Sequence, residues 1–499
     1  MIAPIISWYF RQRSQDLREN LMQSVEMQDA LLEDLVRKLA QTEYGKKYGI
    51  GETARYDEFK QLIPVVNYED LEPYIGRTMA GEQQLLWPGD ITWFAKSSGT
   101  TSNTSKFIPI SYESMEFNHY EGTREALTQY CSSNPNTQIF KGKGLLVGGS
   151  TKVNEFYKKS YYGDLSAVLM NHLPGWANWK STPNMDIAML ENWEEKLEKM
   201  ARATRFENVS SISGVPTWVL LLIKKVLDVS GETQILDVWP NLELFVHGGV
   251  NFNPYREQFK ELIPSASMHY LETYNASEGF FGLQAEQDGQ DLLLLTHHGV
   301  FYEFYPLSGT PENTIPLNEV LIGVNYAMVI TTLGGLWRYI IGDTIQFTGT
   351  KPHTFTITGR TKLFINAFGE ELVIENTDLA ISEACKESGA MPIDYTVAPV
   401  YMSETDPGHE WLIEFSKKPN NIELFTRLLD NALKRCNSDY TAKRQGDLAI
   451  KMPKIIVLEE GSFLEWLKRK GKLGGQHKVP RLSNNRIIVE EIKLMFGLK

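Results

Sequence analysis

A run of small hydroxyl side chains is the first stretch whose residue types could perform chemistry. Ser97, Ser98 and Thr101 belong to a polar segment that ends at Lys106 and follows a short apolar run at 91–94. Hydroxyl donors, an accessible glycine backbone and a lysine cation can together surround the oxygens of a polyphosphate. The lysine-containing P-loop motif is absent from the sequence. Taken alone, the segment is interpreted equally well as a Ser/Thr-rich loop without a ligand.

Two acidic residues follow apolar runs that are typical of buried strands. Glu278 lies in Tyr274-Asn-Ala-Ser-Glu-Gly after the run at 267–273, and Asp343 closes the run Trp337-Arg-Tyr-Ile-Ile-Gly-Asp. Ligands of α/β sheets bind at strand ends, where a carboxylate can hold Mg²⁺ or accept hydrogen bonds from a ribose diol. An ordinary turn is the alternative for each motif, and each motif in isolation favours it.

Two further segments combine glycine with basic residues. Gly359-Arg360-Thr361-Lys362 lies where the apolar pattern changes, so a linker is the simpler interpretation. Gly475-Gln-His-Lys-Val-Pro-Arg481 ends a stretch in which six Lys and Arg residues occur between 468 and 481 without an acidic one. In an acidic chain this local excess of cations could bind an anion such as ATP, or it could be a solvated face.

The elements that must position these residues follow from the apolar periodicity. Helical spacing predicts helices over 14–40, 186–205 and 216–229. Strands are expected at 242–246 and 267–273. Between 290 and 360, short apolar runs alternate with Gly, Pro and Asn, which is typical of an antiparallel sheet or barrel.

The pattern changes again beyond a boundary near 360–369. Helices and strands then alternate over about 130 residues, which predicts a compact α+β unit. The expected elements are helices at 376–387, 421–436 and 462–470, and strands at 394–402, 410–416 and 454–458.

Composition excludes several classes of protein. The chain has 499 residues and a net charge of −12, which disfavours a nucleic-acid partner. Its three cysteines are far apart, which excludes a disulfide framework or a structural zinc site of ordinary spacing and fits a reducing compartment. The uncharged run Val320–Trp337 contains glycines and polar residues, so buried strands are preferred to a membrane span. We expect a cytoplasmic protein without a membrane partner.

Taken together and in order, the motifs resemble those of the adenylate-forming superfamily of acyl-CoA synthetases, adenylation domains and luciferases. Within it, the chain is most similar to the auxin-responsive (Gretchen Hagen) acyl acid amido synthetase family, in its bacterial branch. The resemblance runs from residue 42 to residue 481 and is carried by five strings: Thr42-Glu-Tyr-Gly45, Trp93-Phe-Ala-Lys-Ser-Ser-Gly-Thr-Thr101, Tyr274-Asn-Ala-Ser-Glu278, Leu336-Trp-Arg-Tyr-Ile-Ile-Gly-Asp343 and Gln476-His-Lys-Val-Pro-Arg481.

The resemblance implies a fold and a domain organisation. It predicts an α/β protein with a β-barrel, in which residues 1–361 form an N-terminal domain that binds ATP and the acyl acid. That domain would contain α/β subdomains and an antiparallel barrel. Residues 362–499 would form a small, mobile α+β C-terminal domain that carries a catalytic lysine and swings between two half-reactions.

The resemblance also implies a role for each matching position. ATP phosphates would contact Ser97, Ser98 and Thr101. Asp343 would bind the ribose hydroxyls with help from Arg360, and Glu278 would hold Mg²⁺. The remaining predicted nucleotide-binding residues, which flank or neighbour the adenine, are Gly248, Gly249, Tyr274 and Ser277. Lys478 would reach the α-phosphate and the acyl carboxylate during adenylation.

The implied activity is an ATP-dependent ligase that adenylates a carboxylic acid and transfers the acyl group to an amino acid amine. An acyl-CoA or other acyl-thioester synthetase is the alternative, and a non-catalytic nucleotide sensor is a third reading. Trp218, Val250 and Phe252 are predicted to line the acyl pocket, although a helical apolar face is more often core. His269, His297 and His298 are candidates for the base of the second step by residue type only, and a structural role suits them better.

The sequence departs from the superfamily pattern at three positions. Ser102 stands where the phosphate loop usually has a second glycine, which is compatible with the amido synthetase branch. Lys362 replaces an often acidic hinge residue, and Asn366 occupies the position of a downstream core lysine. The last two departures leave the hinge residue and the domain rotation open.

Overall fold

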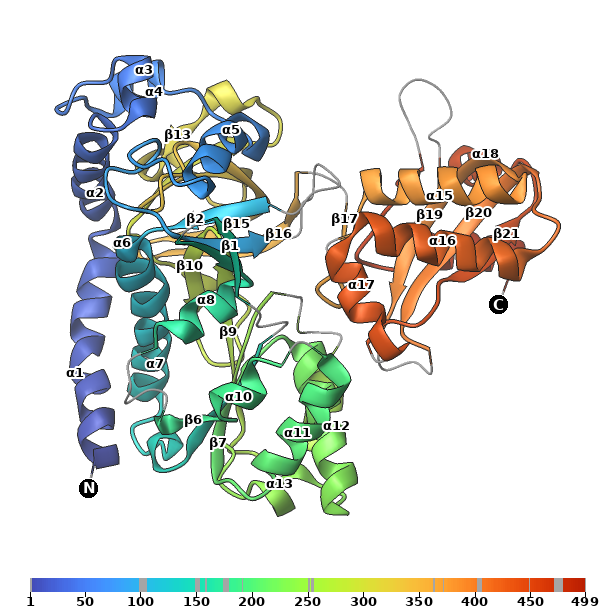
Figure 1. Cartoon of the computed structure of the whole chain (residues 1–499), viewed down its shortest axis with the longest axis horizontal. Helices are drawn as coiled ribbons and strands as arrows, with labels where there is room; N and C mark the ends of the chain where they lie inside the picture. Colours follow the sequence, from blue (N-terminus) through green and yellow to red (C-terminus); the bar gives the residue numbers. More distant parts are fainter. Residues whose placement is uncertain are drawn as a thin grey trace. The chain divides into compact units, whose positions relative to one another are not determined.

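The computed structural model of the chain forms two compact units (Figure 1). It describes residues 2–97, 106–148, 153–157, 159–173, 179–190, 192–249, 252, 255–361, 364–370, 372–401, 406–447, 449–470 and 479–498. The first unit contains the described residues up to 249 and those from 260 to 361. The second contains the described residues among 250–259 and those from 364 onward.

Helices form the N-terminal part of the first unit. The helix expected over 14–40 is two helices, α1 (Ile2–Met22) and α2 (Ser24–Leu39), and the chain between them leaves helical geometry at Gln23. Five of their leucines are buried at the spacing that the periodicity predicts, namely Leu17, Leu21, Leu32, Leu35 and Leu39. The short helices that follow are α3 (Glu43–Tyr48), α4 (Tyr56–Leu62) and α5 (Tyr68–Met79).

A twelve-stranded mixed sheet is the centre of the first unit. Its parallel part has the order β6 (Ser181–Thr182), β3 (Lys143–Val147), β7 (Val209–Gly214), β8 (Leu244–His247) and β9 (His269–Ala276). Helices α11 (Trp193–Thr204) and α12 (Pro216–Ser230) accompany these strands, and α12 ends at Gly231 with a φ of 76°. The expected helix over 186–205 is shorter because Asn192 caps a separate start at Trp193.

The antiparallel part continues from β9 in the same sheet. Its strands, in spatial order, are β10 (Gly279–Gln284), β11 (Leu292–Leu294), β16 (His353–Arg360), β15 (Tyr339–Thr350), β14 (Asn325–Thr332), β12 (Val300–Pro306) and β13 (Ile315–Pro316). The described strands therefore form one open series from β13 to β6, and the expected closed barrel is not seen among them. Strand β14 forms the middle of the uncharged run 320–337, and β15 begins just after that run, at Tyr339.

A second, four-stranded sheet carries the beginning and end of the hydroxyl-rich segment. Strand β1 (Trp93–Ser97) pairs antiparallel with β2 (Lys106–Ile110) and parallel with β5 (Ser160–Gly163), which pairs with β4 (Asn154–Tyr157). Ser97 lies directly opposite Lys106 in this ladder. Beyond β2, the chain enters a π-helical turn, η1 (Met115–Tyr120), and then α7 (Glu121–Ser133), which packs along α1.

A buried ion pair fixes the N-terminal helices to the sheet. Arg338 and Glu303 are 3% and 1% exposed, and the Arg338 Nε lies 2.8 Å from a Glu303 carboxylate oxygen. Arg338 also donates to the backbone oxygens of Lys60 and Ile63 at the end of α4. Arg338 therefore has a structural role within a motif that also contains a candidate site residue.

The second unit has the expected α+β pattern. Strands β19 (Met391–Val400), β20 (Gly408–Lys417) and β21 (Lys454–Leu458) form its main sheet, with β19 and β20 antiparallel and β20 and β21 parallel. Its further elements are β17 (Phe364–Ile365), β18 (Leu372–Val373), α15 (Ile374–Ser388), α16 (Ile422–Cys436), α17 (Ser438–Arg444), α18 (Ser462–Arg469) and α19 (Ile487–Phe496).

A segment from the middle of the sequence belongs to this second unit. The hydroxyl of Tyr255, a fully buried residue, donates to the backbone oxygen of Ala367, and its ring contacts that of Tyr401. The adjacent helix α14 (Arg256–Leu262) begins in this unit, whereas the chain from 260 onward belongs to the first. The two units are therefore not consecutive pieces of sequence.

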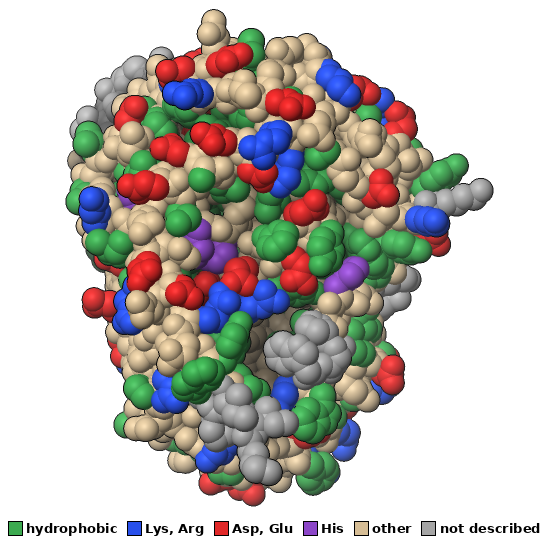
Figure 2. All heavy atoms as spheres, turned by 90° about the vertical axis from the view of Figure 1, so that its left-hand side faces the viewer, with side chains coloured by type: hydrophobic (Ala, Val, Ile, Leu, Met, Phe, Trp, Pro, Cys, Tyr) green, Lys and Arg blue, Asp and Glu red, His purple; other side chains and the backbone are tan. Residues whose placement is uncertain are grey.

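The surface along α1 and α2 carries acidic and basic side chains side by side (Figure 2). None of the described helices combines the length and the apolar character that crossing a membrane requires.

Candidate functional site

Tyr274, Asp343 and Arg360 lie together in the folded chain, although they come from three different strands. Asp343 on β15 and Arg360 on β16 are directly paired across the two strands, and the Arg360 Nε lies 2.6 Å from the Asp343 Oδ1. The Tyr274 hydroxyl, from the end of β9, donates to the other carboxylate oxygen at 2.5 Å. Within the described part of the chain, each Asp343 oxygen thus has one side-chain donor and a further lone pair that a ligand could use.

The electrostatics of this group keep the tyrosine neutral. Burial, followed by the nearby Asp343 charge, raises the pKa of Tyr274 well above its usual range. Tyr274 is therefore a hydrogen-bond donor to Asp343 at neutral pH. A fixed carboxylate with two oriented oxygens is suited to accept hydrogen bonds from two neighbouring hydroxyl groups.

Glu278 lies beside this group at the turn between β9 and β10. The two strands pair through Ala276 and Gly279, which leaves Ser277 and Glu278 in the connection. Both side chains are half-buried. The Glu278 charge contributes to raising the pKa of Tyr274 and of Tyr339, which places this carboxylate within electrostatic reach of both hydroxyls.

A buried cation completes this side of the site. Lys106, which is 9% exposed, directs its Nζ to the Tyr339 hydroxyl at 3.5 Å and lies over the Tyr68 ring at 5.5 Å. Burial, followed by the Glu278 charge, raises the pKa of Tyr339 well above its usual range. The sequence identified Lys106 as the end of the hydroxyl-rich segment. No local pattern predicted that Tyr68 and Tyr339 would lie beside it.

Glycines bring the end of β8 close to the end of β9. A Cβ on Gly248 would lie 2.4 Å from the backbone oxygen of Thr273, and Gly249 has a φ of 80°. Only glycine allows this close approach and this backbone conformation without strain. Because β8 and β9 are parallel, Gly248 and Tyr274 lie at the same carboxyl edge of the sheet, where α/β proteins bind ligands.

Several predicted residues are not brought into this group. Ser97 ends β1 opposite Lys106, but Ser98, Thr101, Lys478 and Val250 lie outside the described residues. Trp218 is buried on α12 and contacts the Trp193 ring at 3.9 Å between centroids. Phe252 belongs to the second unit, where it packs against Phe259 and Arg256.

One buried residue near the site was not anticipated from the sequence. His119 in η1 is 1% exposed, and burial lowers its pKa to about 4, an effect that the nearby Asn275 side chain opposes. The neighbouring Asn118 side chain donates to the backbone oxygen of Phe280 and accepts from its backbone N–H, so the π-helical turn is bonded to the strand β10 that pairs with β9. The other candidate bases lie elsewhere. His269 contacts Gln287 at 2.7 Å, and His297 and His298 lie beside Glu125.

Comparisons with solved structures identify the class of fold. The chain is similar to the GH3.15 acyl acid amido synthetase, with a TM-score of 0.60 and 19% identity over 96% of this chain and 95% of that one. It is also similar to a 2-hydroxyisobutyryl-CoA ligase, with a TM-score of 0.54 and 13% identity over 97% and 92% of the two chains. The large N-terminal part and the smaller C-terminal part thus have the fold of these acyl-activating ligases.

The sequence then places the protein within one family. Residues 13–268 match the GH3 family N-terminal domain, residues 293–360 its central domain and residues 375–487 its C-terminal domain. The chain belongs to the GH3 family.

Two plant enzymes illustrate its relatives. The indole-3-acetic acid-amido synthetase GH3.3 of Arabidopsis thaliana is 24% identical over 93% of this chain and 90% of its own length. The jasmonoyl–L-amino acid synthetase JAR6 of Nicotiana attenuata is 24% identical over 91% and 90%. The matches extend over nearly the whole of both chains.

Proposed function

We propose that this protein is an acyl acid amido synthetase. It adenylates a carboxylic acid with ATP, releases pyrophosphate, and transfers the acyl group to the amine of an amino acid. The observation that carries the proposal is the Tyr274–Asp343–Arg360 group at the sheet edge beside Glu278, in a chain that matches all three GH3 domains. The bacterial branch of this family and a cytoplasmic location remain parts of the proposal.

The nucleotide would lie at the carboxyl edge shared by β8 and β9. Asp343 would accept hydrogen bonds from both ribose hydroxyls, because each of its oxygens keeps a free lone pair beside its protein donor. The adenine would lie between the Gly248–Gly249 backbone and Tyr274, with Ser277 nearby. The phosphates would contact Ser97, which lies opposite Lys106 in the β1–β2 ladder, together with Ser98 and Thr101.

Mg²⁺ fits the donor set on this side of the site, since Glu278 offers a half-buried carboxylate at a turn and hard cations prefer oxygen ligands. Glu278 would hold the ion, which would offset the charge of the triphosphate. Lys106, buried behind Tyr339, adds a fixed positive charge on the same side. These charges reduce the repulsion between an acyl carboxylate and the triphosphate.

The first half-reaction joins the acyl carboxylate to the α-phosphate. A carboxylate oxygen attacks phosphorus, and the bond to the pyrophosphate oxygen breaks in line with that attack. Lys478 would stabilise the negative charge shared between the acyl oxygen and the α-phosphate in the transition state. Orienting both anions for this displacement is the principal task of the site.

The second half-reaction consumes the acyl-adenylate. The unprotonated amine of an amino acid attacks the acyl carbon, AMP leaves, and an amide is formed. Residues 362–499, as a mobile C-terminal domain, would turn between the two steps and keep water out. Trp218, Val250 and Phe252 would contact the acyl group. A thiol acceptor, as in the acyl-CoA ligases of similar fold, would use the same first step.

Pyrophosphate exchange is the experiment that tests this proposal. The purified protein is incubated with ATP, labelled pyrophosphate and single carboxylic acids, without an amine or a thiol. Exchange that depends on the acid supports adenylation. Mixed amino acids are then compared with coenzyme A as acceptors, and amide product supports the amido synthetase over the thioester synthetase. ATP binding without exchange for any acid in a broad aromatic and aliphatic panel would contradict the proposal.

A further inference from the structure

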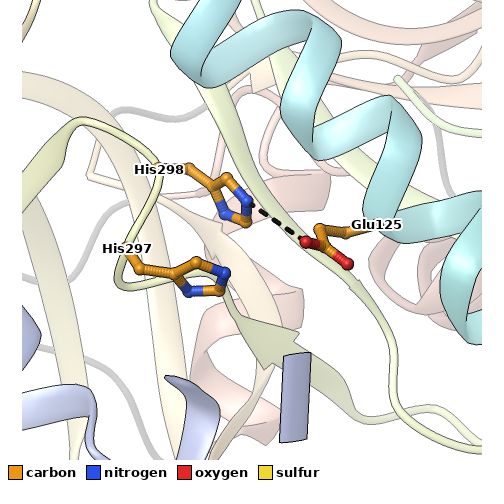
Figure 3. Close-up of side chains that lie close together, drawn as sticks. All are labelled: Glu125, His297 and His298. Carbon is orange, nitrogen blue, oxygen red and sulfur yellow. Dashed lines mark ion pairs between the residues drawn. The ribbon is translucent and has the colours of Figure 1, made fainter. Parts of the chain in front are cut away.

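A compact group of metal-binding side chains lies apart from Asp343 and its neighbours. Glu125 comes from α7, and His297 and His298 come from the bend between β11 and β12. One possible ligand atom from each residue lies within 4.8 Å of the other two (Figure 3). The side chains of Glu125 and His298 are 4% and 1% exposed, and that of His297 is half-buried. The group is thus enclosed but open to solvent on the side of His297.

The two histidines point to the same side of the chain. Consecutive side chains of an extended strand point in opposite directions. Here the two rings are 3.9 Å apart between centroids, at 43° to one another, and both face the helix that carries Glu125 (Figure 3). Gly299, with a φ of 73°, directly follows and allows the chain to bend. Local backbone geometry therefore gathers two imidazoles at one point.

Buried amides hold this bend in place. The Gln28 Nε2 donates to the backbone oxygens of Thr296 at 2.7 Å and of Val300 at 2.8 Å. The Asn118 Nδ2 donates to the backbone oxygen of His298 at 2.7 Å. Gln28 and Asn118 are each 2% exposed. The backbone that presents both imidazoles is therefore fixed before any ligand binds.

Most polar side-chain atoms of this group lack hydrogen-bond partners among the described residues. Among the described residues, none bonds to either ring nitrogen of His297 or His298, or to the Glu125 Oε2. Buried polar atoms are nearly always paired, so five such atoms in one place require an explanation. Two imidazole nitrogens and a carboxylate oxygen are the ligands that divalent zinc accepts.

The charged side chains around this group have a net negative charge that a cation would offset. The Arg13 Nη2 donates to the Glu125 Oε1 at 2.8 Å and also pairs with Glu121. Arg124 pairs with Glu121 and Glu116. Three carboxylates against two guanidinium groups give this network a net charge of −1. The Glu125 Oε1 that accepts from Arg13 also lies 3.9 Å from the His298 Nε2 (Figure 3). Arg13 thus orients the carboxylate in the manner of an outer-shell donor, and Oε1 has a further lone pair for an ion.

We propose that Glu125, His297 and His298 bind a divalent transition-metal ion of the zinc type, with water as the fourth ligand. Three atoms within 4.8 Å of one another share a point that is about 2.8 Å from each or closer. Zinc bonds to nitrogen and oxygen are about 2.0–2.2 Å long, so side-chain movements of less than about 1 Å complete the site. The ion would join α7 to the β11–β12 bend and stabilise the first unit without taking part in adenylation.

Metal titration of the full-length protein tests the site. Chelator-treated protein is titrated with Zn²⁺ and Co²⁺ without nucleotide, and bound metal, the Co²⁺ absorption spectrum and the melting temperature are measured. The variants are His297→Gln, His298→Gln and Glu125→Gln. The matched control is His353→Gln, which changes a buried histidine on β16. Because His297 is only half-buried, His297→Gln carries the test if the more buried variants do not fold.

The wild type is expected to bind one zinc ion and to melt at a higher temperature when zinc is present, because the ion binds the folded chain preferentially. Each ligand variant should lose at least about tenfold in zinc affinity, and His353→Gln should bind zinc with the affinity of the wild type. The absence of zinc binding at micromolar free metal would overturn the proposal. Binding that survives within twofold in both His297→Gln and Glu125→Gln would also overturn it.

Discussion

Substitution of Asp343 by asparagine tests the proposed ribose contact. The change keeps the shape of the side chain but removes its charge, and it replaces one acceptor oxygen with an NH₂ group. That group would face either the Tyr274 hydroxyl or the Arg360 guanidinium, both of which now donate to Asp343. Hydrogen bonds to a charged group contribute about 1.5–3 kcal/mol each. Since a tenfold change corresponds to about 1.4 kcal/mol, kcat/KM for ATP should fall about 10- to 150-fold.

The effect on stability is measured separately from the effect on catalysis. The Asp343 side chain is 10% exposed, so the donor that faces the new NH₂ group loses its acceptor in a largely buried place. Such a loss costs about 1–3 kcal/mol. Thermal unfolding should therefore occur at a moderately lower temperature. Asp228→Asn, at a side chain that is 74% exposed on α12, is the matched control and should leave both readings unchanged.

A second variant, Tyr274→Phe, allows the sizes of two losses of activity to be compared. Tyr274→Phe removes one donor to Asp343 but preserves the carboxylate and its contact with Arg360. Pyrophosphate exchange at varied ATP concentration should therefore show a smaller loss for Tyr274→Phe than for Asp343→Asn. The reasoning is refuted if kcat/KM for ATP in Asp343→Asn stays within twofold of the wild type. A larger loss in Tyr274→Phe would contradict the assignment of the contact to the carboxylate.

Three further variants address other parts of the structure. Lys478→Ala should lower pyrophosphate exchange about 100- to 1000-fold, by analogy with the loss of an oxyanion donor, while ATP binding measured directly changes little; equal losses in both would exclude its proposed role. Glu303→Gln should destabilise the protein by about 3–5 kcal/mol in urea unfolding because it leaves the buried Arg338 charge unpaired, whereas the exposed Glu319→Gln should not. Burial lowers the pKa of His353 to about 4, so between that value and its usual 6.5 the unfolded chain binds the additional proton. Stability should therefore be complete above pH 6.5 and fall toward pH 4 by roughly 1.4 kcal/mol per pH unit for this group, and His353→Gln should reduce that slope.

Periodicity predicted most elements, and its errors have physical causes. Strands β8 and β9 begin two residues later than their apolar runs, and the helix expected over 186–205 is divided because Asn192 caps a new start. The alternation over 290–360 predicted an antiparallel sheet or barrel, and the described strands form the sheet. This sheet continues into the parallel strands because β9 pairs in parallel with β8 and antiparallel with β10. An alternation of apolar runs does not show which strands are neighbours.

The sequence predicted which residues belong to the candidate site, but it did not predict which of them contact one another. The motifs named Tyr274, Asp343 and Arg360, but the bond between Tyr274 and Asp343 joins positions 69 residues apart. No local pattern encodes such a pairing, since it depends on strand order. The Glu125–His297–His298 group was not predicted from the sequence for the same reason. Only the adjacent histidines are visible in the sequence, and their third partner lies on a distant helix.

The segment around Tyr255 has a consequence for how the protein is made. Its partner Ala367 follows 112 residues later in the chain, so the segment leaves the ribosome well before the unit to which it belongs. At roughly 5–20 residues per second, this interval is about 6–22 s. During that time Tyr255 and its neighbours have no completed unit in which to be buried. A chain that ends at residue 361 would keep these aromatic side chains and lack their partners, so simple division of the gene there would yield an aggregation-prone fragment.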